Sequence, residues 1–194
     1  SEGITKVYGN VLMKKIVDLD TMFLTADTLM SIDNEETGKF LLAYYNVKIH
    51  KFDLQGKSDS LSYVVSDSIL YFFRDPVLWN EGSQITADSI NVELAEDRID
   101  KLNTSSNSFI VSLDSSGQYN QVKGRKMVAS FHRNSIEKVD VNGNGESIYF
   151  VLDELTNDIM GMNKILCSNM QIQFKENQVN TISFYTNPEG LFIP

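Results

Sequence analysis

The chain has 194 residues, of which 42% are hydrophobic and 22% are charged, and its formal net charge at pH 7 is −9. This composition is typical of a globular protein of one or two domains with a sizeable core; it excludes a disordered chain, and no run of eighteen apolar residues predicts a membrane-spanning helix. Because the few Lys and Arg residues are scattered, the basic face that nucleic-acid binding requires is absent from the sequence.

The first residues predict an incomplete structural unit. The chain starts at Ser1 rather than at Met, and no signal peptide is visible, which is expected of a processed or shortened chain and leaves export undecided. Residues 4–16 predict a partial or capping unit, since the terminal units of a repeat array are usually atypical. Residues 33–38 predict a turn, and residues 40–49 predict a strand that returns from it.

A strand pattern recurs along the rest of the chain. In residues 85–94, Ile90, Val92 and Leu94 alternate with polar residues, which is typical of a strand with one buried face and one solvated face. Ala87-Asp88-Ser89 introduces this strand. Related patterns occupy residues 25–29, 57–65, 126–131 and 169–174.

The copies of this pattern are regularly spaced. Aligning the first apolar residue of each copy gives five anchors at intervals of 32, 29, 37 and 43 residues: Leu29, Leu61, Ile90, Met127 and Met170. A second series follows the last four anchors after 8, 9, 9 and 9 residues, as hairpin partners should: Ile69, Ile99, Ile136 and Val179. The sequence therefore predicts one unit of a few short antiparallel strands, copied about five times.

A third mark precedes the first copies and is expected to open further strands: Gly9-Asn10-Val11, Tyr45-Asn46-Val47 and Asp75-Pro76-Val77. Residues 103–108 predict a polar loop, and Asn142-Gly143-Asn144-Gly145 is the clearest turn signal. Residues 153–166 predict either the chain's one helix, with apolar residues at offsets 0, 4 and 7, or a long loop. Since few other segments show a helical period, the predicted class is all-β.

Few residues suggest catalysis or metal binding. His50 and His132 lie on predicted strands beside basic residues, where solvated side chains are expected, and Cys167 is expected to be an unreactive, half-buried thiol. We predict no catalytic residue, no metal site and no cofactor.

The recurring Asp27, Asp59 and Asp88 allow one alternative, a ladder of carboxylates for Ca²⁺ binding or glycan cleavage. Each Asp is followed by Ser or Thr at an expected strand start, where a short polar side chain satisfies local backbone donors. The fourth copy has Arg125-Lys126 in place of Asp-Ser, so we favour the structural role.

The segments Gly9-Asn10-Val11, Ala26-Asp27-Thr28 and Ala87-Asp88-Ser89 resemble the "GNV-x-I … ADS-x-x-Y" repeat of the OstA-like, or LptA-like, family of organic-solvent-tolerance and lipopolysaccharide-transport proteins. The resemblance covers nearly the whole chain and is strongest over residues 9–94. Asp75-Pro76-Val77-Leu78-Trp79 looks like the divergent Bacteroidetes-type members.

The resemblance implies a single repeat domain over residues 1–194 and a fold of two facing antiparallel sheets, an open β-taco or β-jellyroll. It further implies a periplasmic, non-enzymatic module that passes the acyl chains of lipopolysaccharide or a related lipid toward the outer membrane, with head-to-tail pairing through edge strands. The expected groove residues are the inward positions of the strand pattern: Leu61, Tyr63, Ile90, Val92, Leu94, Met127, Phe131, Met170, Ile172 and Phe174.

Two other functions remain open. A structural or adhesive β-repeat protein would have the same alternation but a sealed core without a lipid ligand. An enzyme built on the Asp ladder would instead bring several carboxylates together in a cleft.

Overall fold

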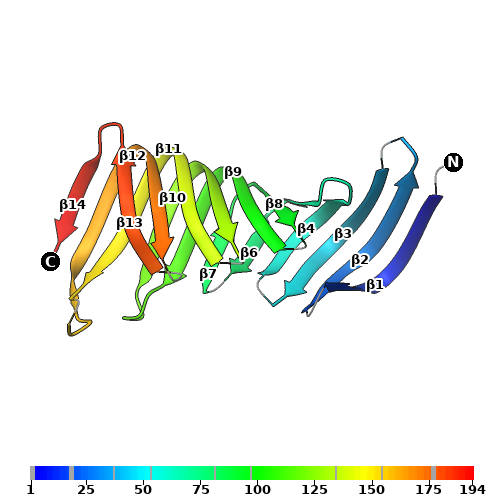
Figure 1. Ribbon diagram of the computed structural model, residues 1–194, viewed down its shortest axis with the longest axis horizontal. Helices are drawn as coiled ribbons and strands as arrows, with labels where there is room; N and C mark the ends of the chain where they lie inside the picture. Colours follow the sequence, from blue (N-terminus) through cyan, green and yellow to red (C-terminus); the bar gives the residue numbers. More distant parts are fainter. Residues whose placement is uncertain are drawn as a thin grey trace.

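The computed structural model describes residues 3–17, 20–36, 38–52, 54–80, 82–96, 98–133, 135–153, 155–175 and 178–194. Ser1, Thr37 of the expected turn and Glu154 of the expected helix lie outside these ranges. The molecule is an elongated stack of strands with its two termini at opposite ends (Figure 1). The described part contains strands and turns, and none of its segments forms a helix suited to crossing a membrane.

Most strands are long. The long strands are β1 (Gly3–Val17), β2 (Asp20–Asn34), β3 (Gly38–Lys51), β4 (Leu54–Val64), β9 (Arg98–Leu113), β10 (Tyr119–His132), β11 (Ser135–Leu152) and β12 (Ile159–Lys175). The others form three interrupted pairs: β5 (Ile69–Phe73) with β6 (Val77–Asn80), β7 (Ser83–Thr86) with β8 (Ser89–Ala95), and β13 (Gln178–Tyr185) with β14 (Glu189–Ile193). When each interrupted pair is counted as one strand, all neighbours are antiparallel and follow each other along the chain.

Each long strand, and each interrupted pair, bends once and so contributes to two sheets. The first sheet contains residues 3–8, 28–34, 38–44, 60–64, 69–73, 89–95, 98–105, 126–132, 135–142, 169–175 and 178–185. The second sheet contains the other half of each strand. In the C-terminal part of Figure 1 the two halves form a front and a back layer that meet along the upper edge. We call this line of bends the corner.

Pairs of consecutive residues with positive φ produce the bends on alternate strands: Gly9–Asn10, Tyr45–Asn46, Arg74–Asp75, Ser106–Asn107, Gly143–Asn144 and Thr186–Asn187. Shifts in the pairing register fall at the same places. Glycine and asparagine are suited to this left-handed region, because most other side chains clash there with the backbone. The recurring Gly-Asn and Tyr-Asn marks are therefore bends within a strand.

Two predicted connections are consequently wrong. The expected loop at residues 103–108 is part of β9, and the expected turn at residues 142–145 is part of β11. In both places a left-handed residue pair bends a continuing strand, whereas the same pair can also close a hairpin. The strands are correspondingly longer than predicted.

The predicted helix at residues 153–166 is also wrong. β11 ends at Leu152, and β12 begins at Ile159. Between them, Oδ1 of Asp153 accepts hydrogen bonds from the backbone N–H groups of Leu155 and Thr156, which fixes a tight turn. The Leu155 side chain is 96% exposed, so it shares no buried face with the apolar residues of β12.

The second series of apolar residues lies on the partner strand of each hairpin, as predicted, but opposite a residue three or four positions beyond the anchor and not opposite the anchor itself. The second series of apolar residues pairs across hairpins as Val64 with Ile69, Leu94 with Ile99, Phe131 with Ile136, and Phe174 with Val179. The five anchors lie in one row of the first sheet beside the corner and face the second sheet.

Candidate functional site

The candidate site is the apolar interior between the two sheets. All ten predicted groove residues lie on the first sheet. Eight of them are at most 7% exposed: Leu61, Tyr63, Ile90, Val92, Met127, Phe131, Met170 and Ile172. Leu94 and Phe174 are partly buried and pack against the same core. Contact with lipid remains a prediction for these residues.

The second sheet supplies the facing wall, whose residues were not predicted from the sequence. Its buried apolar residues include Met22, Leu24, Ile49, Leu54, Leu78 and Ile85. Alternation in residues 22–24 and 47–51 was the available signal, but Phe23 between two inward residues obscured the pattern. These residues precede the Ala-Asp or Ser-Asp mark in their units, whereas the predicted residues follow it.

The middle of the interior is sealed by packing. Val92 and Phe72 are fully buried, and Ile90 is 2% exposed. The side chains around Gly56 on the second sheet fill the space that a Cβ atom would need. Such an atom would overlap Leu78 Cδ2 and would lie 3.6 Å from Phe72 Cε1 of the first sheet. The two sheets are therefore in van der Waals contact at the centre.

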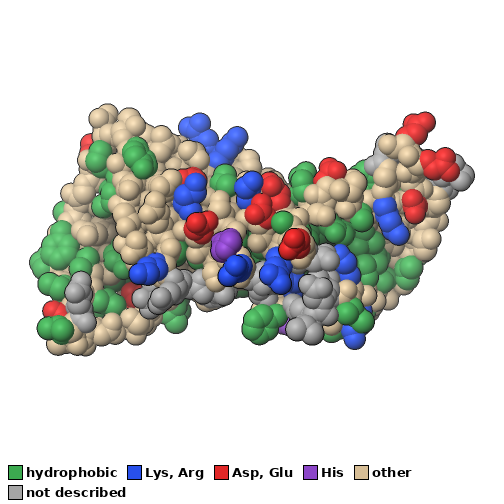
Figure 2. All heavy atoms as spheres, in the orientation of Figure 1, with side chains coloured by type: hydrophobic (Ala, Val, Ile, Leu, Met, Phe, Trp, Pro, Cys, Tyr) green, Lys and Arg blue, Asp and Glu red, His purple; other side chains and the backbone are tan. Residues whose placement is uncertain are grey.

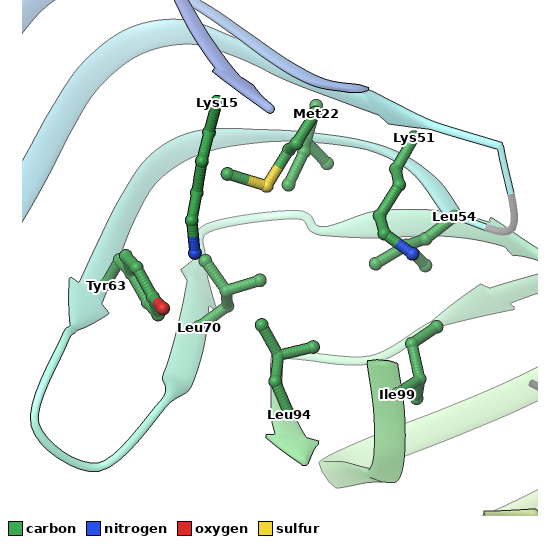
Figure 3. A pocket seen from close by; sticks show the side chains of 9 residues that line it. Lys15, Met22, Lys51, Leu54, Tyr63, Leu70, Leu94 and Ile99 are labelled. Carbon is green, nitrogen blue, oxygen red and sulfur yellow. The ribbon is translucent and has the colours of Figure 1, made fainter. Parts of the chain in front are cut away.

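A small cavity lies between the sheets near the margin opposite the corner (Figure 3). Its volume of about 20 Å³ is close to the space that one water molecule needs. The second sheet contributes Lys15, Met22, Ile49, Lys51 and Leu54, and the first sheet contributes Tyr63, Leu70, Leu94 and Ile99.

Two lysines on this cavity were not predicted as site residues. Lys15 Nζ lies 5.6 Å from the centre of the Tyr63 ring, a cation–π contact that joins the two sheets. Lys51 is 9% exposed, and Figure 3 shows its side chain beside Leu54. Both continue the inward alternation of their strands, two residues beyond Met13 and Ile49, and that spacing was the available signal.

The interior is more exposed at both ends of the stack. Val7 of β1 lies in the same row as the five anchors and is 46% exposed, and Phe192 of β14 is 51% exposed. Figure 2 shows hydrophobic side chains on the floor of a hollow beside the N-terminal strands. β1, β13 and β14 each pair on one side only, so their outer backbone groups are open to another strand.

The recurring aspartates hold the corner together. Asp27 Oδ2 accepts a hydrogen bond of 2.8 Å from Asn46 Nδ2, and both carboxylate oxygens of Asp88 accept from Asn107 Nδ2 at 3.0 and 3.1 Å. Asp59 Oδ2 lies 3.3 Å from the Arg74 guanidinium. Each carboxylate therefore binds the bend of the following strand.

Metal and thiol chemistry receive no support from this arrangement. Within the described ranges, no three His, Cys, Asp or Glu side chains are grouped to hold a metal ion. Cys167 is half-buried beside Gly145, and burial raises the pKa of its thiol although a backbone hydrogen bond involving Tyr185 acts in the opposite direction. A raised pKa leaves less of the reactive thiolate at neutral pH.

Comparison with known proteins shows similarity to solved structures and none to family models or curated sequences. No family model matches the chain, and no curated protein matches it. Among solved structures, the chain is similar to LptH of Pseudomonas aeruginosa, described as the LptA homologous periplasmic component of the conserved lipopolysaccharide transport device. The TM-score is 0.55 at 9% identity, and the match covers 73% of this chain and 95% of that chain. The likeness shows a shared all-β fold.

Proposed function

We propose that this chain is a periplasmic, non-enzymatic carrier module that holds the acyl chains of lipopolysaccharide or a related lipid between its sheets and passes them toward the outer membrane. The observation that carries the proposal is the continuous apolar interior, which two bent sheets enclose and which is exposed at both ends of the stack. The fold that the chain shares with LptH supports it.

The energetics favour acyl chains as the ligand. Burying one CH₂ group contributes about 0.8 kcal/mol, so a chain of about a dozen carbons offers on the order of 10 kcal/mol before entropy costs. Because Ile90, Val92 and Met127 are packed at the centre, an acyl chain there requires these side chains to move apart. We therefore expect a chain to enter first at an end. The net charge of −9 disfavours the entry of phosphorylated headgroups into the interior, so they would stay outside it.

Two adjacent leucines of β3 provide a matched test. Leu41 pairs with Tyr63 on the inner face and packs against the core, whereas Leu42 pairs with Ser62 on the outer face. Leu41→Asp puts a carboxylate into the apolar interior near the N-terminal end, and this should weaken lipopolysaccharide binding by about tenfold or more. Leu42→Asp makes the same change of charge outside the interior and should leave binding unchanged.

Binding is measured by fluorescence titration of each variant after its fold has been checked by circular dichroism. Equal binding by folded versions of both variants would refute the interior as the lipid site. Mass spectrometry of lipids that co-purify with the native protein identifies the acyl class independently.

The open edges support a second part of the proposal, head-to-tail pairing of β1 with β13 or β14 of another copy or of another transport component. Sedimentation should show association that increases with concentration. A strict monomer at millimolar concentration would contradict this pairing and would leave lipid binding untouched.

The sealed centre favours one alternative, a structural or adhesive repeat protein without a lipid ligand. A cavity of about 20 Å³ cannot hold an acyl chain without rearrangement, and the core is otherwise well packed. Lipid-free native protein that does not bind lipopolysaccharide would establish this alternative.

A further inference from the structure

The corner has a constant spacing in most units. The left-handed asparagine of one strand lies 19 residues after the corner residue of the preceding strand: 46 − 27, 107 − 88 and 144 − 125 all equal 19. In the first two cases the Asn amide donates to an aspartate carboxylate. In the third case the preceding residue is Arg125, which has no acceptor to offer.

This unit therefore presents donors where the units of Asp27 and Asp88 have a hydrogen-bonded carboxylate. Asn144 is exposed, and among the described residues its side-chain amide has no hydrogen-bond partner. The Arg125 side chain packs along Gly143: its Nε lies 3.4 Å and its Cζ 3.6 Å from where a Cβ of that glycine would stand. Neither Arg125 nor the neighbouring Lys123 forms an ion pair with another described residue.

These groups line a groove of about 580 Å³ on the outside of the corner, across β9 to β12. The one carboxylate on its lining, that of Glu146, is bound to Lys164 at 2.8 Å. Arg125, Lys123 and the Asn144 amide thus line the groove without an ion-paired or hydrogen-bonded partner among the described residues, in a protein whose net charge is −9. Basic side chains protrude along the upper edge of the molecule in Figure 2, where the strands bend.

We propose that this groove binds the phosphate group of a phosphomonoester, with the anion in the place that the carboxylates of Asp27 and Asp88 occupy at their own corners. A guanidinium and an ammonium together match the charge of a phosphomonoester, and arginine can bind two of its oxygens at once. The volume is within the range of small-molecule sites, so it also accommodates a group of the size of a sugar attached to the phosphate. The phosphate belongs either to a soluble sugar phosphate or to the headgroup of a lipid.

The test uses the intact chain and its NMR signals for residues 125, 143 and 144. Inorganic phosphate and glucose 6-phosphate are titrated at constant ionic strength, with chloride as the reference anion, and saturable shifts at these residues are expected. Vesicles made of equal parts phosphatidylcholine and phosphatidic acid form a separate arm, with pure phosphatidylcholine as its reference. Binding of the soluble phosphates alone assigns a soluble ligand, whereas binding of phosphatidic acid vesicles assigns a lipid headgroup.

Arg125→Asp is the informative variant, because the introduced carboxylate can accept the Asn144 amide as in the other units, so the fold is retained. It should weaken phosphate binding by about tenfold or more. Arg98→Asp is the matched control, since it makes the same change of charge at a hairpin turn of the first sheet, away from the corner. It should change phosphate affinity by less than about twofold.

Two results would overturn the proposal: shifts with phosphate that do not saturate and do not exceed those with chloride, or equal phosphate affinities of the folded Arg125→Asp and Arg98→Asp variants. Phosphate binding is tested separately from acyl binding: Leu41→Asp should weaken lipid binding and leave phosphate binding unchanged.

Discussion

Replacing Gly56 with alanine tests how tightly the side chains of Leu78 and Ile49, its neighbours on the second sheet, pack at the centre of the interior. The added methyl group would overlap Leu78 Cδ2 and lie 3.0 Å from Ile49 Cγ2. Leu78 is fully buried, so it cannot turn away without disturbing its neighbours. Overpacking of this kind costs about 1–3 kcal/mol, and the loss of glycine's flexibility in the unfolded chain offsets about 0.5–1 kcal/mol of that.

Gly190→Ala provides the matched control. Gly190 lies in the same row of the second sheet but on the edge strand β14, where the nearest atom to an added methyl group would be Ile165 Cγ1 at 3.9 Å. This variant should be as stable as the parent or slightly more stable. The two midpoints of thermal unfolding should therefore differ by about 2–12 °C, at about 2–4 °C per kcal/mol for a chain of this size. Equal midpoints in calorimetry would refute this close packing of Leu78 and Ile49 over Gly56.

Three further predictions follow from the described contacts, each read from urea unfolding. Val92→Asp should cost several kcal/mol because it buries a carboxylate, whereas Asn91→Asp on the outer face should cost little. Asp88→Ala should cost about 1 kcal/mol by removing the acceptor of the Asn107 amide, and Asp88→Asn should cost less because an amide oxygen still accepts; equal losses would contradict this contact. Burial acts to raise the pKa of the Asp114 carboxyl, but hydrogen bonds from the turn after it outweigh burial and hold the pKa below its ordinary value. Since the folded pKa is the lower one, the stabilisation is complete above about pH 4 and is lost as the pH falls through the folded value, so Asp114→Asn should flatten the acid side of the stability curve.

The sequence was most informative where side-chain alternation determined the structure. Apolar residues eight or nine positions beyond an anchor indicated the partner strand of each hairpin, and alternation indicated its inward face, because a one-residue slip would turn every buried side chain outward. The register itself was not predicted, since these residues pair with residues three or four positions beyond the anchors. The bends were not predicted, because Gly143–Asn144 has the left-handed preference of both a hairpin turn and a bend within a strand. Only the pairing on both sides of it distinguishes the two structures.

Of the two sheets that enclose the interior, only the first had its inward residues predicted from the sequence. Residues such as Ile90 follow the Ala-Asp mark and stood out, whereas Met22 and Leu24 precede it and are separated by the apolar Phe23. Whether the sheets touch depends on small residues such as Gly56 and on the shape of their neighbours, which a pattern of apolar and polar residues does not encode. The same holds for the corner contacts, although the constant spacing of 19 between Asp27 and Asn46 was present in the sequence.

The order of the strands relates the length of the molecule directly to the number of hairpins in the chain. Because every strand lies beside its predecessor in the chain when each interrupted pair is counted as one strand, the length of the stack is set by the number of hairpins, at about 4.8 Å per strand. Duplicating one hairpin would lengthen it by about 10 Å and leave the same kind of edge strand at each end. Such a chain can be fitted to a distance by adding or deleting whole hairpins, with little effect on the contacts within the others.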